Sequence, residues 1–546
     1  LGAALFVAGE RLWSNSTPIL RNTVGRKAVP ELLRMVEPTM RQAILQILPD
    51  PRLQPTRRGI RPQTLARLVR FLLPVVRNVL LNLASPGRRR ESIVESGERL
   101  LAETRQRCRS LDGAPRERLR QTVGIFDEIT RSQLGWVFTR FVSLVASGMV
   151  SFMQLSRLVD EAARSLPPEA RQRVSDLVLQ VTRGMPYNPT TEMDLALWQL
   201  AKDLRRDPAS LEALQSNDAH ALAGRYRTGD LPASLRQAVD SFLARYGERG
   251  LGEIDLGRPR WAADPSPVME MLASFVQIDD EAHAPDVVFA QGARSAEAAV
   301  AELAEIAGAG RLGWMRQRQV RFFAGRARQL MGGRESPKFF AVRLMGVFQA
   351  ALLEAGRELA QQGELSAADD VVYLKLDELT GFAAGAPCPE GGSWQALINA
   401  RRAAYRRELL RRQIPRLLLS DGRAFYEGLS APESAAGSAH TLHGSPVSPG
   451  SAEGRVRVVF DPRQAGLLPG EILVCPGTDP SWTPLFLSAG GLVLETGGMM
   501  THGAVVAREY GIPAVVGVDR ATQRLRTGSL VRLDGSTGQI HLLEEE

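Results

Sequence analysis

Residues 497–509 read GGMMTHGAVVARE and place one histidine, His502, between a glycine-rich turn and a short run with helical periodicity. An apolar run typical of a strand, GLVLE at 491–495, comes just before it. Glycines let the backbone approach a ligand closely, and the free N–H groups at a helix start favour negative charge. An unprotonated imidazole nitrogen beside such a cradle can attack a phosphoryl group, carry it and pass it on. The alternative interpretation is a histidine that merely follows a turn.

The sequence on both sides of this stretch alternates short apolar runs with turn residues, a pattern typical of a small α/β domain. One helix is predicted at Gly503–Tyr510, directly after the histidine. A proline-rich loop, PGTDPSWTP at 476–484, also follows a predicted strand, so we expect it at the same sheet end as the histidine turn. The predicted strands are Arg455–Phe460, Glu471–Cys475, Leu492–Glu495, Ala514–Val518, Leu530–Leu533 and Gln539–Leu543.

The longer N-terminal part has a helical pattern. Apolar residues recur at three- and four-residue spacing, most clearly in Leu134–Leu166, Ser295–Met331 and Phe339–Gln362. Small and polar residues at 431–442 predict a flexible linker. We therefore expect a multidomain α + α/β protein: a mostly helical region at 1–430, the linker at 431–442, and a small β/β/α domain at 443–546.

Composition excludes several classes of function. The chain has 546 residues and a formal net charge of +8, but only four of its basic residues are lysines, which indicates a compositional bias towards arginine. No basic, aromatic-interleaved module is present, so we expect no nucleic-acid partner. Three widely separated cysteines and six scattered histidines predict neither disulfides nor a metal site and favour the cytoplasm.

Several motifs in the last hundred residues resemble the swivelling phosphohistidine domain of the phosphoenolpyruvate-utilising enzymes. They are GSPVSPGSAEG at 444–454, the 478–484 loop, the segment 497–508 and YGIPAV at 510–515. The resemblance implies that His502 is the phosphorylated histidine. It also implies that Gly498, Thr501, Gly503 and Arg508 position the phosphoryl group, although Arg508 could instead pair with its neighbour or cap the helix. Met500 departs from the family, which usually has threonine there.

The helical region is similar to the drug-binding domain of the rifampin phosphotransferase family. The similarity lies in RYGERGLGEID at 245–255, RPRW at 258–261, RESPKF at 334–339 and DDVVYL at 369–374. The first fifty residues differ from that family, because NSTP at 15–18 replaces its pocket pattern. The identity of the acceptor therefore stays open.

Two groups of charged residues are candidates for binding the acceptor. Glu253, Asp255, Arg258 and Arg260 lie on one irregular loop, where they could hold a hydroxyl group and phosphate oxygens. A structural salt-bridge loop is an equally good interpretation. Lys338 and Arg343 lie on a predicted helix, and Arg343 is our candidate phosphate clamp, with a solvated helix charge as the alternative. These candidates are Glu253, Asp255, Arg258, Arg260, Lys338 and Arg343.

Together, these features predict the acceptor-binding and phosphohistidine-carrier part of an ATP-dependent, dikinase-type phosphotransferase. By resemblance, ATP and Mg²⁺ bind an ATP-grasp domain, whose glycine-rich loop and lysine are not found in this sequence. That domain is expected upstream in the same polypeptide or in another chain, and this chain alone binds no cofactor. The acceptor is expected to be a hydroxyl-bearing small molecule, antibiotic-like in character.

Two alternatives belong to other classes. One is a catalytically silent relic or regulatory binding protein that has lost its donor, which an upstream coding sequence without an ATP-grasp module would favour. The other is a peripheral membrane protein that uses Leu65–Leu83, although its arginines at helical spacing favour a half-buried helix and no membrane partner.

Overall fold

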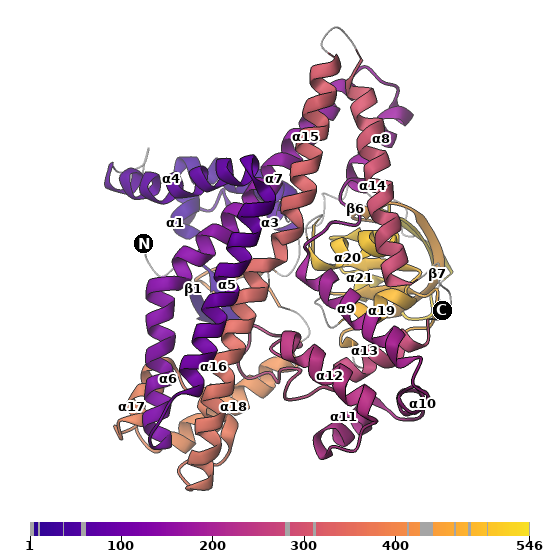
Figure 1. Cartoon of the computed structure of the whole chain (residues 1–546). Coiled ribbons are helices and arrows are strands. Elements are labelled where there is room, and N and C mark those ends of the chain that lie inside the picture. The colour runs from indigo at the N-terminus through magenta and orange to yellow at the C-terminus, as the bar shows by residue number, and fades with distance from the viewer. Residues whose placement is uncertain are drawn as a thin grey trace.

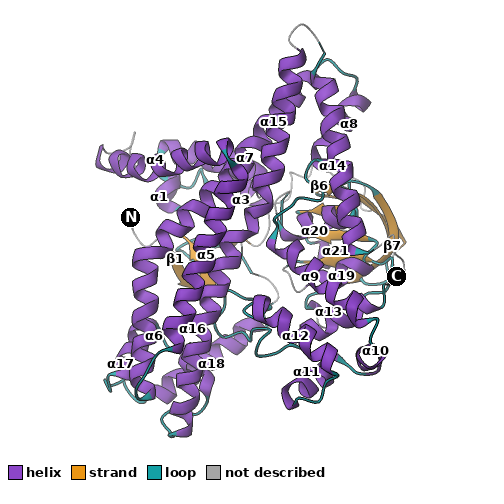
Figure 2. Ribbon diagram, viewed as in Figure 1, coloured by secondary structure: helices purple, strands orange, loops and turns teal. Residues whose placement is uncertain are grey.

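The computed structural model describes the chain except for residues 1–4, 9–10, 37, 56–61, 279–283, 310–312, 412–413, 416, 426–440, 463–465, 479–481, 499–500 and 545–546. The N-terminal region is mostly helical, as predicted, and Figures 1 and 2 show that several of its helices are long. They are α1 (Thr17–Leu20), α2 (Thr23–Val36), α3 (Pro38–Ile47), α4 (Pro62–Ala84), α5 (Pro86–Arg109), α6 (Pro115–Ile129), α7 (Gly135–Ala163), α8 (Pro168–Gln180), α9 (Pro189–Leu204), α10 (Pro208–Ser216), α11 (Ala219–Thr228), α12 (Ala233–Tyr246), α13 (Ser266–Val276), α14 (Pro285–Ala307), α15 (Gly313–Met331), α16 (Ser336–Gln361), α17 (Leu376–Ala383) and α18 (Trp394–Leu409).

The predicted helical segments correspond to real helices with shifted ends. Leu134–Leu166 contains α7, and Phe339–Gln362 begins one turn inside α16. Ser295–Met331 covers the second half of α14 and all of α15. A glycine, Gly308, lies just past α14 and separates the two.

Two short hairpins interrupt the helical region, and neither was predicted. One pairs β1 (Leu5–Ala8) with β2 (Arg11–Ser14), and the other pairs β3 (Leu417–Leu418) with β4 (Ala424–Phe425). Both lie at the ends of the helical region. The residues between β3 and β4 include Gly422, whose φ of +85° fits a tight turn.

The C-terminal domain contains a mixed eight-stranded sheet. In spatial order its strands are β5 (Thr441–His443), β12 (Gln539–Glu544), β11 (Leu530–Asp534), β7 (Ser451–Val458), β8 (Ile472–Cys475), β9 (Gly491–Leu494), β10 (Ala514–Val516) and β6 (Ser445–Ser448). Strands β7 to β10 pair in parallel, and the remaining pairs are antiparallel. All six predicted strands are present, whereas β5 and β6 were missed.

Each face of the parallel strands packs on its own hydrophobic core, because side chains alternate along a strand. Leu473, Cys475 and Leu492 face the core beneath α19 (Thr483–Ser488) and α20 (His502–Tyr510). Ile472 and Val474 face the opposite core, which also holds residues of β11, β12 and α21 (Ala521–Arg524). The histidine helix α20 is therefore fixed on one face of the sheet.

The two edges of the sheet meet in sequence. Strands β5 and β6 end opposite edges of the strand order, yet Gly444 alone separates them. The Gly444 N–H donates to the carbonyl of Gly538, and a Cβ at Gly444 would come within 2.6 Å of Val515 Cγ1. Only glycine fits this point, where the chain passes from one edge strand of the sheet to the other.

The C-terminal domain rests against the helical region beside α9, α13 and α14 (Figure 1). Helix α20 packs on α14, and α19 packs on α13. The predicted linker lies outside the described residues over 431–440, and its last two residues, Thr441 and Leu442, belong to strand β5. We call this contact between the two parts the docked arrangement.

Two helical segments among the described residues are long and apolar enough to cross a membrane, Thr139–Ala163 and Gly313–Gln361. In these two segments, 44% and 61% of the most apolar 18-residue window is buried, as is common in the core helices of soluble proteins. Within helix α4, which contains the apolar run Leu65–Leu83, the segment Leu73–Ala84 is a shorter apolar helix.

Candidate active site

The turn before α20 is built by short backbone contacts. Thr501 precedes the helix in an extended conformation, and both its N–H and its hydroxyl donate to the carbonyl of Gly498, at 3.0 and 2.9 Å. Gly497 has a φ of +132°, a value that favours glycine. The threonine hydroxyl is therefore engaged within the turn. Met500 lies outside the described residues.

Gly503 allows the start of α20 to lie tightly against the sheet. A Cβ at this position would come within 2.6 Å of Thr478 Oγ1 and 2.7 Å of Leu494 Cδ1, both closer than ordinary contact. Thr478 belongs to the proline-rich loop, so this loop and the histidine turn do meet at one end of the sheet, as predicted. The Thr478 hydroxyl is buried without a hydrogen-bond partner among the described residues.

His502 is the first residue of α20, and its Nε2 atom is enclosed although the residue as a whole is partly exposed. Nε2 has no hydrogen-bond partner among the described residues. The ring packs 6.4 Å from the Phe486 ring, centroid to centroid. Burial lowers the pKa of His502 to about 4; the nearby Glu335 carboxylate acts to raise it, and Lys338, Arg334 and Arg249 act to lower it further. The imidazole is therefore neutral at physiological pH.

A charged cluster from the helical region faces this histidine. It consists of Arg249, Glu253, Arg334, Glu335 and Lys338. Lys338 Nζ lies 2.9 Å from Glu253 Oε1, and Arg249 Nε lies 2.6 Å from Glu253 Oε2. Arg334 pairs with Glu335 at 2.7 Å. Three cations and two carboxylates thus converge on His502 from loop 247–260, from the turn Gly332–Glu335 and from the start of α16.

The two carboxylates of this cluster are held ionised by their neighbours. Burial acts to raise the pKa of Glu335, but Arg334, His502 and Lys338 lower it overall. Burial likewise acts to raise the pKa of Glu253, and Arg249 and Lys338 more than offset this effect. The charges of this cluster are therefore in position before a phosphoryl group arrives. The cluster has one more positive than negative charge, and this excess can stabilise a negatively charged phosphoryl group.

Three predicted acceptor residues have other partners. Arg343 Nη1 lies 2.5 Å from Glu98 Oε1, and its guanidinium stacks 5.0 Å over the Phe339 ring, so its assignment as the phosphate clamp is not supported by its contacts. Arg260 donates to Gln349 and to the Glu253 carbonyl. Asp255 accepts a hydrogen bond of 2.5 Å from the Tyr405 hydroxyl. Helical spacing alone could not show which face of α16 packs against its neighbours.

Arg508 also has a structural partner. It is 1% exposed, and its Nη1 donates to the carbonyl of Val447 at 2.9 Å, within the C-terminal domain. Burial lowers its pKa to about 9, and the nearby Arg334 lowers it further. Its contact with β6 supports the alternative of a structural role over that of a phosphate ligand.

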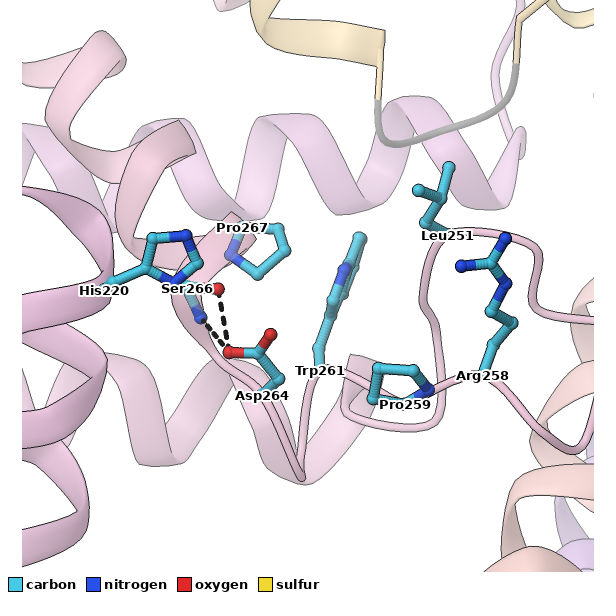
Figure 3. Close-up of a pocket in the computed structure, with 8 residues that line it drawn as sticks. All are labelled: His220, Leu251, Arg258, Pro259, Trp261, Asp264, Ser266 and Pro267. Atoms are coloured by element: carbon cyan, nitrogen blue, oxygen red, sulfur yellow. Dashed lines mark hydrogen bonds between the residues drawn. The ribbon is translucent and has the colours of Figure 1, made fainter. Parts of the chain in front are cut away.

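Arg258 lines a cavity of about 300 Å³ beside the same loop. Figure 3 shows Trp261 standing between Pro267 and Leu251, with Arg258 at one end. The Asp264 carboxylate accepts hydrogen bonds from the Ser266 N–H and hydroxyl. The complete lining is His220, Leu251, Arg258, Pro259, Trp261, Asp264, Ser266 and Pro267. Its mixture of apolar walls and a few polar groups is typical of a small-molecule site.

Sequence reasoning did not select Arg249, Arg334, Glu335 and Thr478 as site residues. All four lie within the motifs 245–255, 334–339 and 478–484, so the motifs themselves were the available signal. Among the described residues, no three His, Cys, Asp or Glu side chains are grouped so as to hold a metal ion.

Comparison with known families now identifies both parts of the chain. Residues 467–538 match the mobile domain of the PEP-utilising enzymes, which defines the class of the C-terminal domain. Residues 140–335 match the fourth domain of rifampicin phosphotransferase. The chain therefore carries a rifampicin phosphotransferase fourth domain followed by a PEP-utilising mobile domain.

Curated relatives agree with these matches. The chain is 36% identical over 366 residues to a rifampicin phosphotransferase of Streptomyces sviceus, covering 66% of this chain and 41% of the relative. It is 33% identical over 364 residues to that of Bacillus subtilis, with the same coverage. A prodigiosin synthesizing transferase of Serratia marcescens is 28% identical over 405 residues, which is 73% of this chain and 44% of that protein. The chain thus spans about two fifths of the length of these relatives.

Proposed function

We propose that this chain transfers phosphoryl groups from a donor to a hydroxyl-bearing small molecule, with His502 as the carrier. The observation that carries the proposal is the enclosed Nε2 atom of His502, neutral and without a partner among the described residues, in front of Arg334, Lys338 and Arg249. A free lone pair on this nitrogen can form the P–N bond. The three cations can then neutralise the phosphoryl oxygens.

We propose that discharge to the acceptor uses the same charged groups around His502. The acceptor oxygen attacks phosphorus, the P–Nε2 bond breaks and its electron pair returns to the ring. The hydroxyl proton replaces the phosphoryl group on the imidazole, and Glu335 is the carboxylate placed to relay it. Because charge moves little beyond the phosphoryl group, catalysis depends on positioning and on charge neutralisation.

The cavity beside Arg258 supports an acceptor of modest size. Its volume of about 300 Å³ and its apolar walls suit a compact, partly aromatic molecule. The Trp261 ring forms part of the wall, and its indole N–H is buried without an acceptor among the described residues. The names of the relatives make an antibiotic a reasonable first compound to test.

Charging requires a different arrangement, because the enclosed Nε2 atom cannot reach a donor while the domain is docked. We propose that the C-terminal domain swings away to an ATP-grasp domain, which belongs either to the same polypeptide or to a partner chain. ATP and Mg²⁺ act there, and the reaction yields AMP, inorganic phosphate and the phosphorylated acceptor.

Labelling with [β-³²P]ATP in the presence of an ATP-grasp partner tests this proposal. The wild-type chain is expected to acquire acid-labile label, and His502→Ala is expected to lose it. His443→Ala is the matched control, because His443 is an exposed histidine of the same domain. Label that persists in His502→Ala would contradict the assignment.

A further inference from the structure

The far end of α20 makes a second contact with the helical region, at Glu509. Its carboxylate is 4% exposed and accepts two backbone hydrogen bonds across the interface, from the N–H of Gly184 at 2.8 Å and from that of Met185 at 3.3 Å. Two consecutive N–H groups that point at one carboxylate form an anion-binding nest. Glu509 therefore binds a site that the helical region builds from its backbone.

Contacts within the helical region hold this nest in place. Arg328 of α15 donates to the carbonyls of Val181, Arg183 and Gly184, at 2.8, 2.7 and 3.0 Å, which turns the loop N–H groups outwards. Gly184 has a φ of +52°, and a Cβ there would come within 2.3 Å of the backbone N of Ala293. Met185 is buried with Phe152, Ala327 and Met331. The loop is thus fixed from three sides.

The balance of forces at Glu509 suits a reversible contact. Burial raises its pKa to about 7, against the lowering effect of the two N–H donors and of Arg508 and Arg328. Arg183 and Tyr510 also lie near this carboxylate. Docking thus exchanges hydration of the Glu509 side chain for two backbone hydrogen bonds, and the raised pKa means that the protonated side chain docks more easily than the ionised one.

We propose that Glu509 is a positioning residue, which anchors α20 on the Gly184–Met185 nest. The anchor holds His502 against the charged cluster of the helical region. This inference rests on the proposed function. Helix α20 has nine residues, so about 10 Å of rigid helix separates the anchor from the histidine. Loss of the anchor shifts the equilibrium towards the released domain without changing any group that contacts the phosphoryl group.

Phosphoramidate provides the test, because it phosphorylates histidine directly and releases ammonia, with no donor domain required. Its reaction at His502 Nε2 measures the released fraction, since the docked arrangement encloses that atom. At pH 6, where the docked Glu509 is mostly protonated, Glu509→Ala is expected to raise the rate at His502 by roughly tenfold, from the loss of two hydrogen bonds. Glu509→Gln, which keeps one acceptor oxygen, is expected to give a smaller increase. The exposed His443 is the internal reference, with an unchanged rate.

Two further measurements separate anchoring from general damage. Gly184→Ala disturbs the nest from the helical side and is expected to raise the His502 rate as well, whereas Glu305→Ala, at an exposed glutamate of α14, is expected to have no effect. Hydrogen exchange of the 184–185 amides is expected to quicken in Glu509→Ala while the β8 and β9 amides stay protected. Unchanged exchange at 184–185 together with an unchanged His502 rate would overturn the proposal. The exchange measurement reports on the anchor even if His502 carries no phosphoryl group in the natural reaction.

Discussion

Replacement of Gly503 by alanine tests the tight fit between α20 and the sheet. The added Cβ would lie 2.6 Å from Thr478 Oγ1 and 2.7 Å from Leu494 Cδ1. Leu494 is 1% exposed and cannot move aside, so the start of α20 must shift. Overpacking of this kind costs about 1–3 kcal/mol. The gain of about 1 kcal/mol from replacing a helical glycine by alanine offsets part of it.

The expected result is a carrier domain destabilised by about 1 kcal/mol, with His502 displaced by a few tenths of an ångström. Such a displacement lowers the transfer rate by roughly tenfold or more, because phosphoryl transfer depends on positioning. Urea unfolding measures the stability, and single-turnover transfer from phosphorylated His502 measures the rate.

Gly325→Ala is the matched control. Gly325 lies inside α15, and a Cβ there meets nothing within 4 Å, so this variant is expected to gain about 0.5–1 kcal/mol. If Gly503→Ala matches Gly325→Ala in both stability and transfer, the steric argument for the start of α20 is refuted.

Three further predictions concern charge. Lys338→Met is expected to slow discharge of phosphohistidine by roughly a hundredfold. Arg343→Met is expected to lower the unfolding free energy by about 1–3 kcal/mol without a specific effect on discharge. Equal effects of the two substitutions on discharge would contradict the role of the charged cluster. In the docked arrangement His502 stays neutral down to pH 4–5, since burial lowers its pKa to about 4, and deuterium exchange at the ring C–H titrates it. The docking free energy contributed by His502 is fully present above pH ~6.5 and is lost as the pH falls towards 4. The docking free energy contributed by Glu509, whose pKa is raised to about 7, is present at low pH and is lost as the pH rises through 7. Because these contributions oppose each other, docking of the wild-type domain is expected to vary little between pH 4.5 and 6.5. In Glu509→Gln, docking is expected to weaken by up to ~tenfold per pH unit on acidification. Small-angle scattering measures docking in both proteins, and a flat pH profile for Glu509→Gln would contradict this prediction.

The sequence predicted the C-terminal domain well because its chemistry is local. Strands β8, β9 and β10 are apolar runs between turns, and helix α20 begins directly after a glycine-rich turn. The missed strands β5 and β6 contain serine, proline and histidine. They are strands only because β5 pairs with β12 and β6 pairs with β10. Their existence depends on tertiary pairing, which short-range patterns do not carry.

In the candidate site, too, the local features were predicted and the contacts between distant residues were not. His502 stood out because its turn and helix are adjacent in sequence, and Lys338 was selected from its motif. The partners of Arg343 and Asp255, Glu98 and Tyr405, lie more than a hundred residues away in sequence, so no spacing rule could reveal them. The role of Glu335 likewise depends on a histidine from another domain.

The short strands at both edges of the C-terminal sheet have a consequence for the motion that we propose for this domain. A long edge strand would offer unpaired backbone groups to neighbouring molecules whenever the domain moved into solvent, and such edges template aggregation. Here the edge strands β5 and β6 have only three and four residues and are joined through Gly444, so both edges are short. The chain also enters the C-terminal domain at β5, so one of these short edges lies next to the predicted linker.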